Sequence, residues 1–434
     1  MKTENGKLKK YKLGEICKNI TDGEHGTVVD SPDGKYFLLS NKNIVDGKIV
    51  INATTDRRID KQTFDKINKR TKLEKDDVLI STVGTLGKLC IVDPNFNYTI
   101  QRSVGVIKPN QEKLNPNFLK YLLMTNTYQN LLQNTSKGAV QKCIFIDDLK
   151  NLNVSIPPLE SQQKIAAVLS ALDDKISLNR RMNAKLEQMA KRLYDHWFVQ
   201  FDFPFDSAQQ PTRSQLVSER SRGYKSSGGK MEYNEVLKRE IPARWEVQKL
   251  GDVCEIVLGG TPSTANNEFW ENGTINWLNS GEVGIFPIVE SEKKITEIAV
   301  EKSTTEFLKA GSVTLSITRY LRPSILTIDA CINQSVVGIK ENDLFKNSFL
   351  YPYLQNEIDR LMSLRTGAQQ PHINKEIVED SFIIIPPKDL MDKYKTKASP
   401  IYSQIINIAK ETQKLTALRD RLLPLLINGQ VEVK

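Results

Sequence analysis

The sequence predicts an α+β protein in which one β-rich module occurs twice and each copy is followed by a long helix. Three observations carry this prediction: a diverged repeat, strand-like runs inside each copy, and a helical period after each copy. Chance explains one or two matches, but not five in the same order. The matched segments are Lys12–Cys17 with Lys249–Cys254, Asp77–Ser81 with Ser312–Ser316, Ser103–Lys108 with Ser335–Lys340, Gly138–Gln141 with Gly367–Gln370, and Ile156–Pro158 with Ile385–Pro387.

Composition is consistent with a folded protein of more than one domain. The chain has 434 residues, of which 39% are hydrophobic and 26% charged, and its net charge of +9 favours a polyanionic partner. The five cysteines form no C-x-x-C pair, which indicates buried free thiols in a reducing cytoplasm. We find neither a secretion signal nor an apolar run long enough to span a membrane, so no membrane partner is expected.

Each copy contains short runs with the β-branched content of strands. Helical patches are expected at 117–132 and 348–364, which makes each module an α+β domain of roughly 150 residues. The expected strands are 78–82, 89–92, 104–107 and 152–156 in the first copy, and 313–317, 325–328, 336–339 and 382–385 in the second.

After each Ile-Pro-Pro, apolar residues recur in steps of three and four, which indicates a coiled-coil seam. Each seam needs a partner for its apolar stripe, and the other seam of the same chain is the nearest candidate. Asn179 either fixes the register or is a tolerated surface-facing position. The candidate seam and subunit-interface residues are Leu169, Leu172, Ile176, Met182, Leu186 and Leu193, followed by Ile401, Ile405, Ile408, Leu415 and Leu422.

Prolines and glycines suggest where these helices begin and end. Pro157 and Pro158 mark the start of the first helix, because proline does not fit a helix interior. Ser399 and Pro400 have the pattern of an N-cap and a first helical residue, so Pro400 is expected to interrupt any helix begun at Pro387. Gly429 is a plausible stop.

The resulting organisation has five parts. Residues 201–240 are polar and rich in glycine and serine, and a solvated linker is favoured there over a DNA-contacting segment. The parts are a first module at 1–156, a first spacer helix at 157–200, the linker at 201–240, a second module at 241–385, and a second spacer helix with its tail at 386–434.

No motif for catalysis, a cofactor or a metal is recognisable. The two Pro-Pro pairs lack the polar and aromatic neighbours of an amino-methyltransferase motif, and Gly84–Lys88 lacks the glycine spacing of a P-loop. The three histidines show no zinc pattern. Asp173–Lys175 and Glu292–Lys294 match half of a nuclease pattern, but the first is expected on the outside of the coiled coil and the second in a charge run. The sequence therefore predicts no catalytic residue, no cofactor and no metal.

Loops that match in frame but differ in side chains are the best candidates for reading DNA. Arginine and lysine can pair with guanine, and glutamine with adenine, in the major groove. Ordinary drift of loops in a duplicated fold is the alternative explanation. The candidates are Thr82, Thr85, Lys88, Lys137, Gln141 and Lys142 in the first module, and Thr261, Thr264, Thr318, Arg319, Tyr320, Arg322, Gln369, Gln370 and His372 in the second.

Two further features allow both a structural and a functional interpretation. The basic stretch 57–72 could neutralise phosphates or could be a solvated helix face. Gly259 and Gly260 permit close approach of the backbone to a ligand. Trp270 and Trp277 are expected in the core rather than stacked on bases.

At this point the chain resembles the specificity subunits of type I restriction–modification systems, over nearly its whole length. The most specific segment, residues 156–176, reads IPPLESQQKIAAVLSALDDKI. The resemblance implies two target-recognition domains separated by two long antiparallel helices, which set the spacing of a split target. It implies double-stranded DNA, two methyltransferase subunits and restriction–translocase subunits as partners. It also implies a subunit that is not an enzyme by itself. The second spacer, 389–399, is less typical.

Two other classes of function stay open at this point. A self-sufficient methyltransferase or nuclease would modify DNA without other subunits. A protein scaffold would show absent or salt-insensitive DNA binding, whereas phosphate contacts give a steep dependence on salt.

Overall fold

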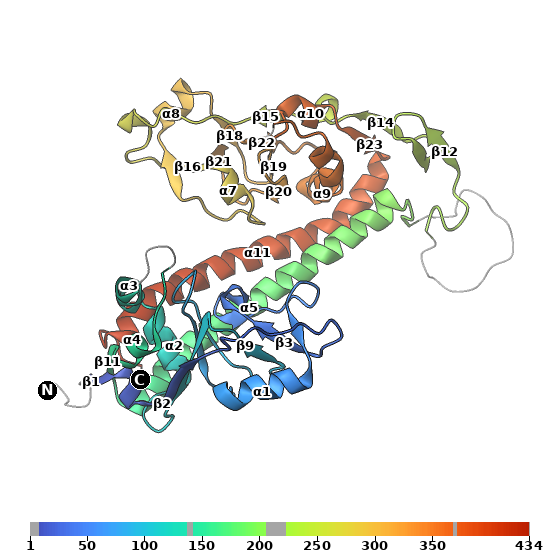
Figure 1. Cartoon of the computed structure of the whole chain (residues 1–434). Helices are drawn as coiled ribbons and strands as arrows, with labels where there is room; N and C mark the ends of the chain where they lie inside the picture. Colours follow the sequence, from blue (N-terminus) through green and yellow to red (C-terminus); the bar gives the residue numbers. More distant parts are fainter. Residues whose placement is uncertain (1–7, 137–141, 205–222, 368–370, 434) are drawn as a thin grey trace. The chain divides into compact units, whose positions relative to one another are not determined.

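The chain forms two compact units in a computed structural model that describes residues 8–136, 142–204, 223–367 and 371–433 (Figure 1). The first unit comprises Met1–Ile176 with Leu415–Lys434, and the second comprises Ser177–Lys414. Each unit therefore contains one β-rich module and a segment of each long helix.

The first unit is built around a four-stranded antiparallel sheet in the order β2-β10-β7-β8. A second sheet has the order β6-β3-β9, with β3 parallel to β9, and β1 pairs with β11. The strands are β1 (Lys9–Lys12), β2 (Cys17–Asp22), β3 (Tyr36–Leu39), β4 (Ile44–Val45), β5 (Lys48–Ile49), β6 (Arg58–Ile59), β7 (Val78–Ser81), β8 (Leu89–Ile91), β9 (Tyr98–Ile100), β10 (Val104–Pro109) and β11 (Asn153–Ile156).

The central strand β7 is buried on both faces, which explains its continuous apolar run. Val78 and Ile80 pack into one cluster with Phe118 of α2 (Pro116–Met124). Leu79 points to the opposite cluster, where it packs with Ile100 of the second sheet. Alternate side chains of one strand thus build two cores.

The second unit repeats this topology. Its main sheet has the order β15-β22-β19-β20, its second sheet β17-β16-β21-β18, and β14 pairs with β23. The parallel pair β3–β9 recurs as β16–β21. The strands are β14 (Glu246–Lys249), β15 (Ile256–Leu258), β16 (Ile275–Leu278), β17 (Lys293–Ile295), β18 (Glu306–Leu308), β19 (Val313–Ser316), β20 (Arg322–Ile325), β21 (Ala330–Ile332), β22 (Val336–Ile339) and β23 (Phe382–Ile385). The duplicated α+β fold predicted from the repeat is confirmed.

Helices also correspond between the units, and several begin at a side-chain cap. Asp60 accepts a hydrogen bond from the Thr63 amide at the start of α1, and Thr296 accepts one from the Ala299 amide at the start of α8. The shorter helices are α1 (Lys61–Thr71), α3 (Asn126–Thr135), α4 (Ile146–Lys150), α6 (Leu250–Val253), α7 (Ser280–Val283), α8 (Glu297–Lys302), α9 (Asn347–Ser363) and α10 (Lys375–Glu379).

Three expected segments differ from the structure. The helical patch at 117–132 is two helices, because Thr125 leaves the helical conformation between α2 and α3. The strand expected at 325–328 lies earlier, as β20 at Arg322–Ile325. The stretch 201–240 is not wholly a linker, since β12 (Met231–Asn234) pairs there with β13 (Arg239–Pro242).

Two long helices, α5 (Leu159–Tyr194) and α11 (Lys388–Ile427), follow the modules. In the second unit they run antiparallel, since Asn179 bonds Glu411 (2.7 Å) while Tyr194 contacts the ring of Tyr394. In the first unit, Arg419 Nη1 lies 3.0 Å from Asp173 Oδ1. The expected pairing of the two helices is confirmed.

Pro400 does not interrupt α11, contrary to the expectation that a helix would start there. The helix begins at Lys388 and continues through Ser399 and Pro400. Packing outweighs the local preference, since Tyr394 before the proline and Tyr402 and Ile405 after it are buried in the same cluster. Gly429 does end the helix, with φ of +68° and hydrogen bonds from its amide to Leu426 O and from the next amide to Leu425 O.

The eleven seam residues are all buried or half-buried on these two helices. Asn179 is only 1% exposed, so it is not a surface-facing residue, and its amide donates to Glu411. Asp173 is half-buried rather than free on the outside of the helix pair, because Tyr121 OH of α2 (2.7 Å) and Arg419 of α11 both bind its carboxylate. Burial lowers the pKa of the adjacent Lys120, which lies 3.6 Å from Asp173, and the carboxylate opposes that shift.

No helix within the described ranges combines the length and apolarity needed to cross a membrane.

Candidate functional site

In the first unit, loops meet at one end of the four-stranded sheet. The loop after β7 is held on one side by the Thr82 amide, which donates to Ser103 O (3.0 Å). On the other side, the Ile144 amide donates to Thr82 O (2.9 Å). The loop after β2 joins them, because the Gly23 amide donates to Val104 O (3.1 Å).

The second unit repeats these bonds at equivalent positions. The Ile317 amide donates to Ser335 O (3.0 Å), and the Ile373 amide donates to Ile317 O (3.1 Å). The Gly259 amide donates to Val336 O (3.2 Å). The two pairs of loops matched in the sequence are therefore neighbours in each unit.

Glycine is required where the loop after β2 or β15 leaves the sheet. A Cβ on Gly23 would lie 2.3 Å from Ile100 O, and one on Gly259 would lie 2.2 Å from Ile332 O. Only a residue without a side chain permits this approach. The positions that follow, His25 and Thr261, carry side chains that differ between the units.

The loop after β19 presents an aromatic ring and two cations. Tyr320 is 66% exposed, and the Arg322 guanidinium lies 5.4 Å from the centre of its ring. Arg319 is exposed and has a φ of +58°, which is uncommon for a residue other than glycine. Thr318 forms a bridge with His372, which brings these two candidates together.

In the first unit the equivalent loop presents Thr85 and Lys88, both exposed, with Lys142 on the neighbouring segment. Gly84 and Gly87 adopt positive φ angles of +79° and +76°, which turn the chain back towards β8. These three side chains are available to a ligand.

Thr82 was expected to be available to DNA, and this expectation is wrong. It is 3% exposed, and its hydroxyl donates to Arg102 O (3.2 Å). The residue continues the line of β7 and is enclosed by the neighbouring loops, so its side chain serves the loop rather than a ligand. Lys137, Gln141, Gln369 and Gln370 lie outside the described residues.

Thr261 and Thr264 lie on the loop after β15, and both are exposed. The Thr261 hydroxyl donates to Gln334 Oε1, which joins this loop to the turn before β22. Trp277 is a core residue, as expected, with its indole N–H donating to Gly260 O (3.1 Å). Trp270 is only half-buried.

Arg102 and Gln334 were not among the residues predicted from the sequence, and they occupy equivalent places on the turns before β10 and β22. Arg102 is exposed, and its amide donates to Glu24 O (3.0 Å) in the loop after β2. A signal was present, because both residues immediately precede a matched Ser-Val pair and differ between the copies.

The arrangement offers cations, amides and hydroxyls suited to hydrogen bonds with a polyanion or with base edges. Across the residues that the structure describes, no group of three or more histidine, cysteine, aspartate or glutamate side chains could hold a metal ion.

Together these features define a class of tandem binding protein, in which two copies of one scaffold present different loops at the same end of a sheet. The chain belongs to the family of type I restriction–modification specificity subunits, with one recognition domain in each of two matched segments, residues 5–188 and 242–418. The matching family model is described as the type I restriction modification DNA specificity domain.

Relatives agree with this assignment over the full length. The chain is 25% identical over 470 residues to the type I restriction enzyme HindI specificity subunit of Haemophilus influenzae, covering 98% of this chain and 99% of that protein. It is 25% identical over 451 residues to the MjaIX specificity subunit of Methanocaldococcus jannaschii, covering 100% and 96%. Its fold is similar to the crystal structure of an S subunit from M. genitalium, with a TM-score of 0.60, 17% identity, and coverage of 98% and 97%.

Proposed function

We propose that each unit reads one half of a split sequence in double-stranded DNA with the loops at the end of its four-stranded sheet. The observation that carries the proposal is that equivalent backbone bonds hold loops with different side chains. Arg102 stands where the second unit has Gln334, and Lys88 belongs to the loop that corresponds to the one with Arg322. Conserved backbone with changed side chains is expected of two surfaces that read different bases.

The recognition domains in this proposal are residues 1–156 and 241–385. The candidate DNA-contacting side chains are those exposed at the sheet ends, with Arg102 and Gln334 added and Thr82 removed. The candidates outside the described residues keep their place in the proposal, since they belong to the same loops.

The two long helices set the spacing of the half-sites and dock two methyltransferase subunits, which restriction–translocase subunits then join. Apolar side chains on the outside of the helices support this role. Leu178 and Met189 of α5 are 44% and 49% exposed, and Leu418 of α11 is 45% exposed. Apolar surface on a helix that is otherwise packed suits contact with another protein.

The chain itself contributes recognition and no catalytic step, and it acts in the cytoplasm on DNA. The catalytic groups belong to its partners. The support is the loop chemistry, which offers hydrogen bonds and positive charge for binding.

The test is a map of methylated bases. The cognate methyltransferase subunit is expressed in a host free of methylation, with and without this chain, and modified bases are located by single-molecule sequencing. We expect a split motif with a fixed gap that appears only when this chain is present.

The same map without any difference, from subunits that are associated and folded, would contradict the proposal. Methylation by the purified chain alone would contradict the non-catalytic role.

A further inference from the structure

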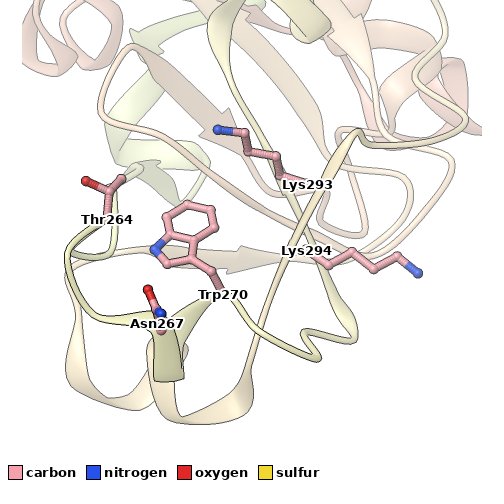
Figure 2. Close-up of a pocket in the computed structure, with 5 residues that line it drawn as sticks. All are labelled: Thr264, Asn267, Trp270, Lys293 and Lys294. Carbon is pink, nitrogen blue, oxygen red and sulfur yellow. The ribbon is translucent and has the colours of Figure 1, made fainter.

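The second unit has an open pocket of about 440 Å³ beside β17, the edge strand of its second sheet. It is lined by Thr264 and Asn267, by the indole of Trp270, and by Lys293 and Lys294 of β17 (Figure 2). Four of these side chains are exposed, so the pocket is open to a large ligand.

The indole of Trp270, which forms one wall of the pocket, is fixed by contacts with residues that do not line the pocket. The Trp270 indole N–H donates to Ser263 O (3.0 Å), and its ring meets the buried Trp277 edge-on with centroids 5.2 Å apart. Trp277 is fixed in turn by its bond to Gly260 O. The wall is thus preformed, and binding does not have to order it.

The charge of the pocket is positive. The described residues that line it contribute two ammonium groups, one amide and one hydroxyl, and none of them carries a carboxylate. Lys293 Nζ lies 5.7 Å from the centre of the Trp270 ring. Neither lysine forms an ion pair with any residue that the structure describes.

The first unit has Arg57 and Arg58 at the corresponding place, and both guanidinium groups are bound by other residues of that unit. Ile59 and Ile295 are equivalent, because Ile59 pairs with Tyr36, the first residue of β3, and Ile295 pairs with Ile275, the first residue of β16. The two residues before each isoleucine therefore correspond as well. Arg57 pairs with Asp30 (2.7 Å), and Arg58 donates to Ala53 O (2.9 Å). The arginine pair of the first unit is therefore engaged in contacts within that unit, whereas the lysine pair of the second unit is exposed.

The pocket is continuous with the loops at the sheet end. Thr261 bonds Gln334 at that end, and the same loop reaches the pocket three residues later at Thr264. A polyanion that follows this loop from Thr261 to Thr264 would reach the pocket.

We propose that this pocket binds the sugar–phosphate backbone of double-stranded DNA beside the half-site that the second unit reads. The lysines, the hydroxyl and the amide contact phosphate oxygens, and the Trp270 ring packs against a deoxyribose. This inference rests on the proposed function, and it assigns to the pocket affinity without sequence information.

The test compares the double variant Lys293→Ala/Lys294→Ala with the unaltered chain, each assembled with its methyltransferase subunits. Binding to a duplex with the mapped motif and to a scrambled duplex is measured by fluorescence anisotropy across a series of salt concentrations. The slope of log K for DNA binding against log salt is negative, and each lost phosphate contact makes it less steep by about 0.9. We expect the slope of the double variant to be less steep by about two, and its affinity at 0.15 M salt to fall on the order of thirtyfold for both duplexes.

Lys309→Ala is the matched control, because Lys309 is also exposed but precedes β19 at the opposite end of the sheet. It should leave the slope unchanged. An unchanged slope in the double variant would overturn the inference, as would a changed methylation motif, which would indicate base reading. Loss of assembly with the methyltransferase would assign the pocket to a subunit contact and also overturn it. If the unaltered complex showed no motif at all, the proposed function would fail instead.

Discussion

Arg102 and Gln334 occupy equivalent positions, and their chemistry differs in a way that matters for DNA. Arginine offers two donors to guanine, whereas glutamine offers a donor and an acceptor to adenine. Gln334 is also oriented by Thr261, which leaves its amide group placed at the sheet end.

Arg102→Ala should relax the methylation motif in one half, and Gln334→Ala should relax it in the other. Loss of a bidentate base contact reduces discrimination at one base pair by about 1–3 kcal/mol. The measurement is the methylation map, with Lys309→Ala as the unchanged reference. Both variants altering the same half would contradict the assignment of one unit to each half-site.

Cysteine residues provide a second prediction at this scale, because the thiolate is the reactive form. Burial raises the pKa of Cys90 and Cys254 to about 12, and that of Cys331 to about 11. We expect these thiols to react with Ellman's reagent at pH 8 only after unfolding. Denatured chain, in which all thiols are accessible, gives the full signal for comparison. Fast reaction of any of the three in the folded chain would contradict their burial, since each is at most 5% exposed.

Among the elements, α11 shows how packing overrides a local signal. Pro400 has no amide hydrogen to donate to Thr396 O, so one helical hydrogen bond is missing. The helix continues because Tyr394 and Tyr402 on either side of the proline are buried in one aromatic and aliphatic cluster.

Pro400→Ala should raise the free energy of unfolding, by about 1–3 kcal/mol, since alanine restores the amide and favours the helix. Thermal melting of the variant against the unaltered chain measures this. Ser403→Ala, an exposed position one turn later, should change the melting temperature little. A lower melting temperature for Pro400→Ala would mean that the proline itself is needed for packing of the buried tyrosines.

At the scale of the whole molecule, duplication of one module explains both the fold and the presence of two similar sets of sheet-end loops. Each unit combines a module with part of α5 and part of α11. The first unit is completed by Leu415–Lys434 from the end of the chain, whereas the second is the continuous segment Ser177–Lys414. The bonds that hold the sheet-end loops lie within each unit, which suggests that the two reading surfaces are independent.

Exchange of residues 1–155 for those of another family member should therefore change one half of the methylated motif and leave the other half intact. The measurement is again the methylation map. The reciprocal exchange of residues 241–385 serves as the control and should change the opposite half. A motif altered in both halves by either exchange would refute independent reading.

The sequence by itself determined the duplicated α+β fold, most strands and the two long helices. It could do so because β-branched runs, the seam period, and residues such as Gly429 act locally or repeat along the chain. The matched loops were also visible, since they differ in side chains within a common frame.

Only the tertiary structure decided which side chains face the same space. Thr82 is enclosed, Asp173 binds Arg419, and Arg102 and Gln334 lie beside the loops at the sheet ends. It also decided that α11 continues through Pro400, where burial of Tyr394 and Tyr402 against the rest of the second unit outweighs one lost hydrogen bond. These outcomes depend on contacts between residues far apart in the chain, which no local pattern contains.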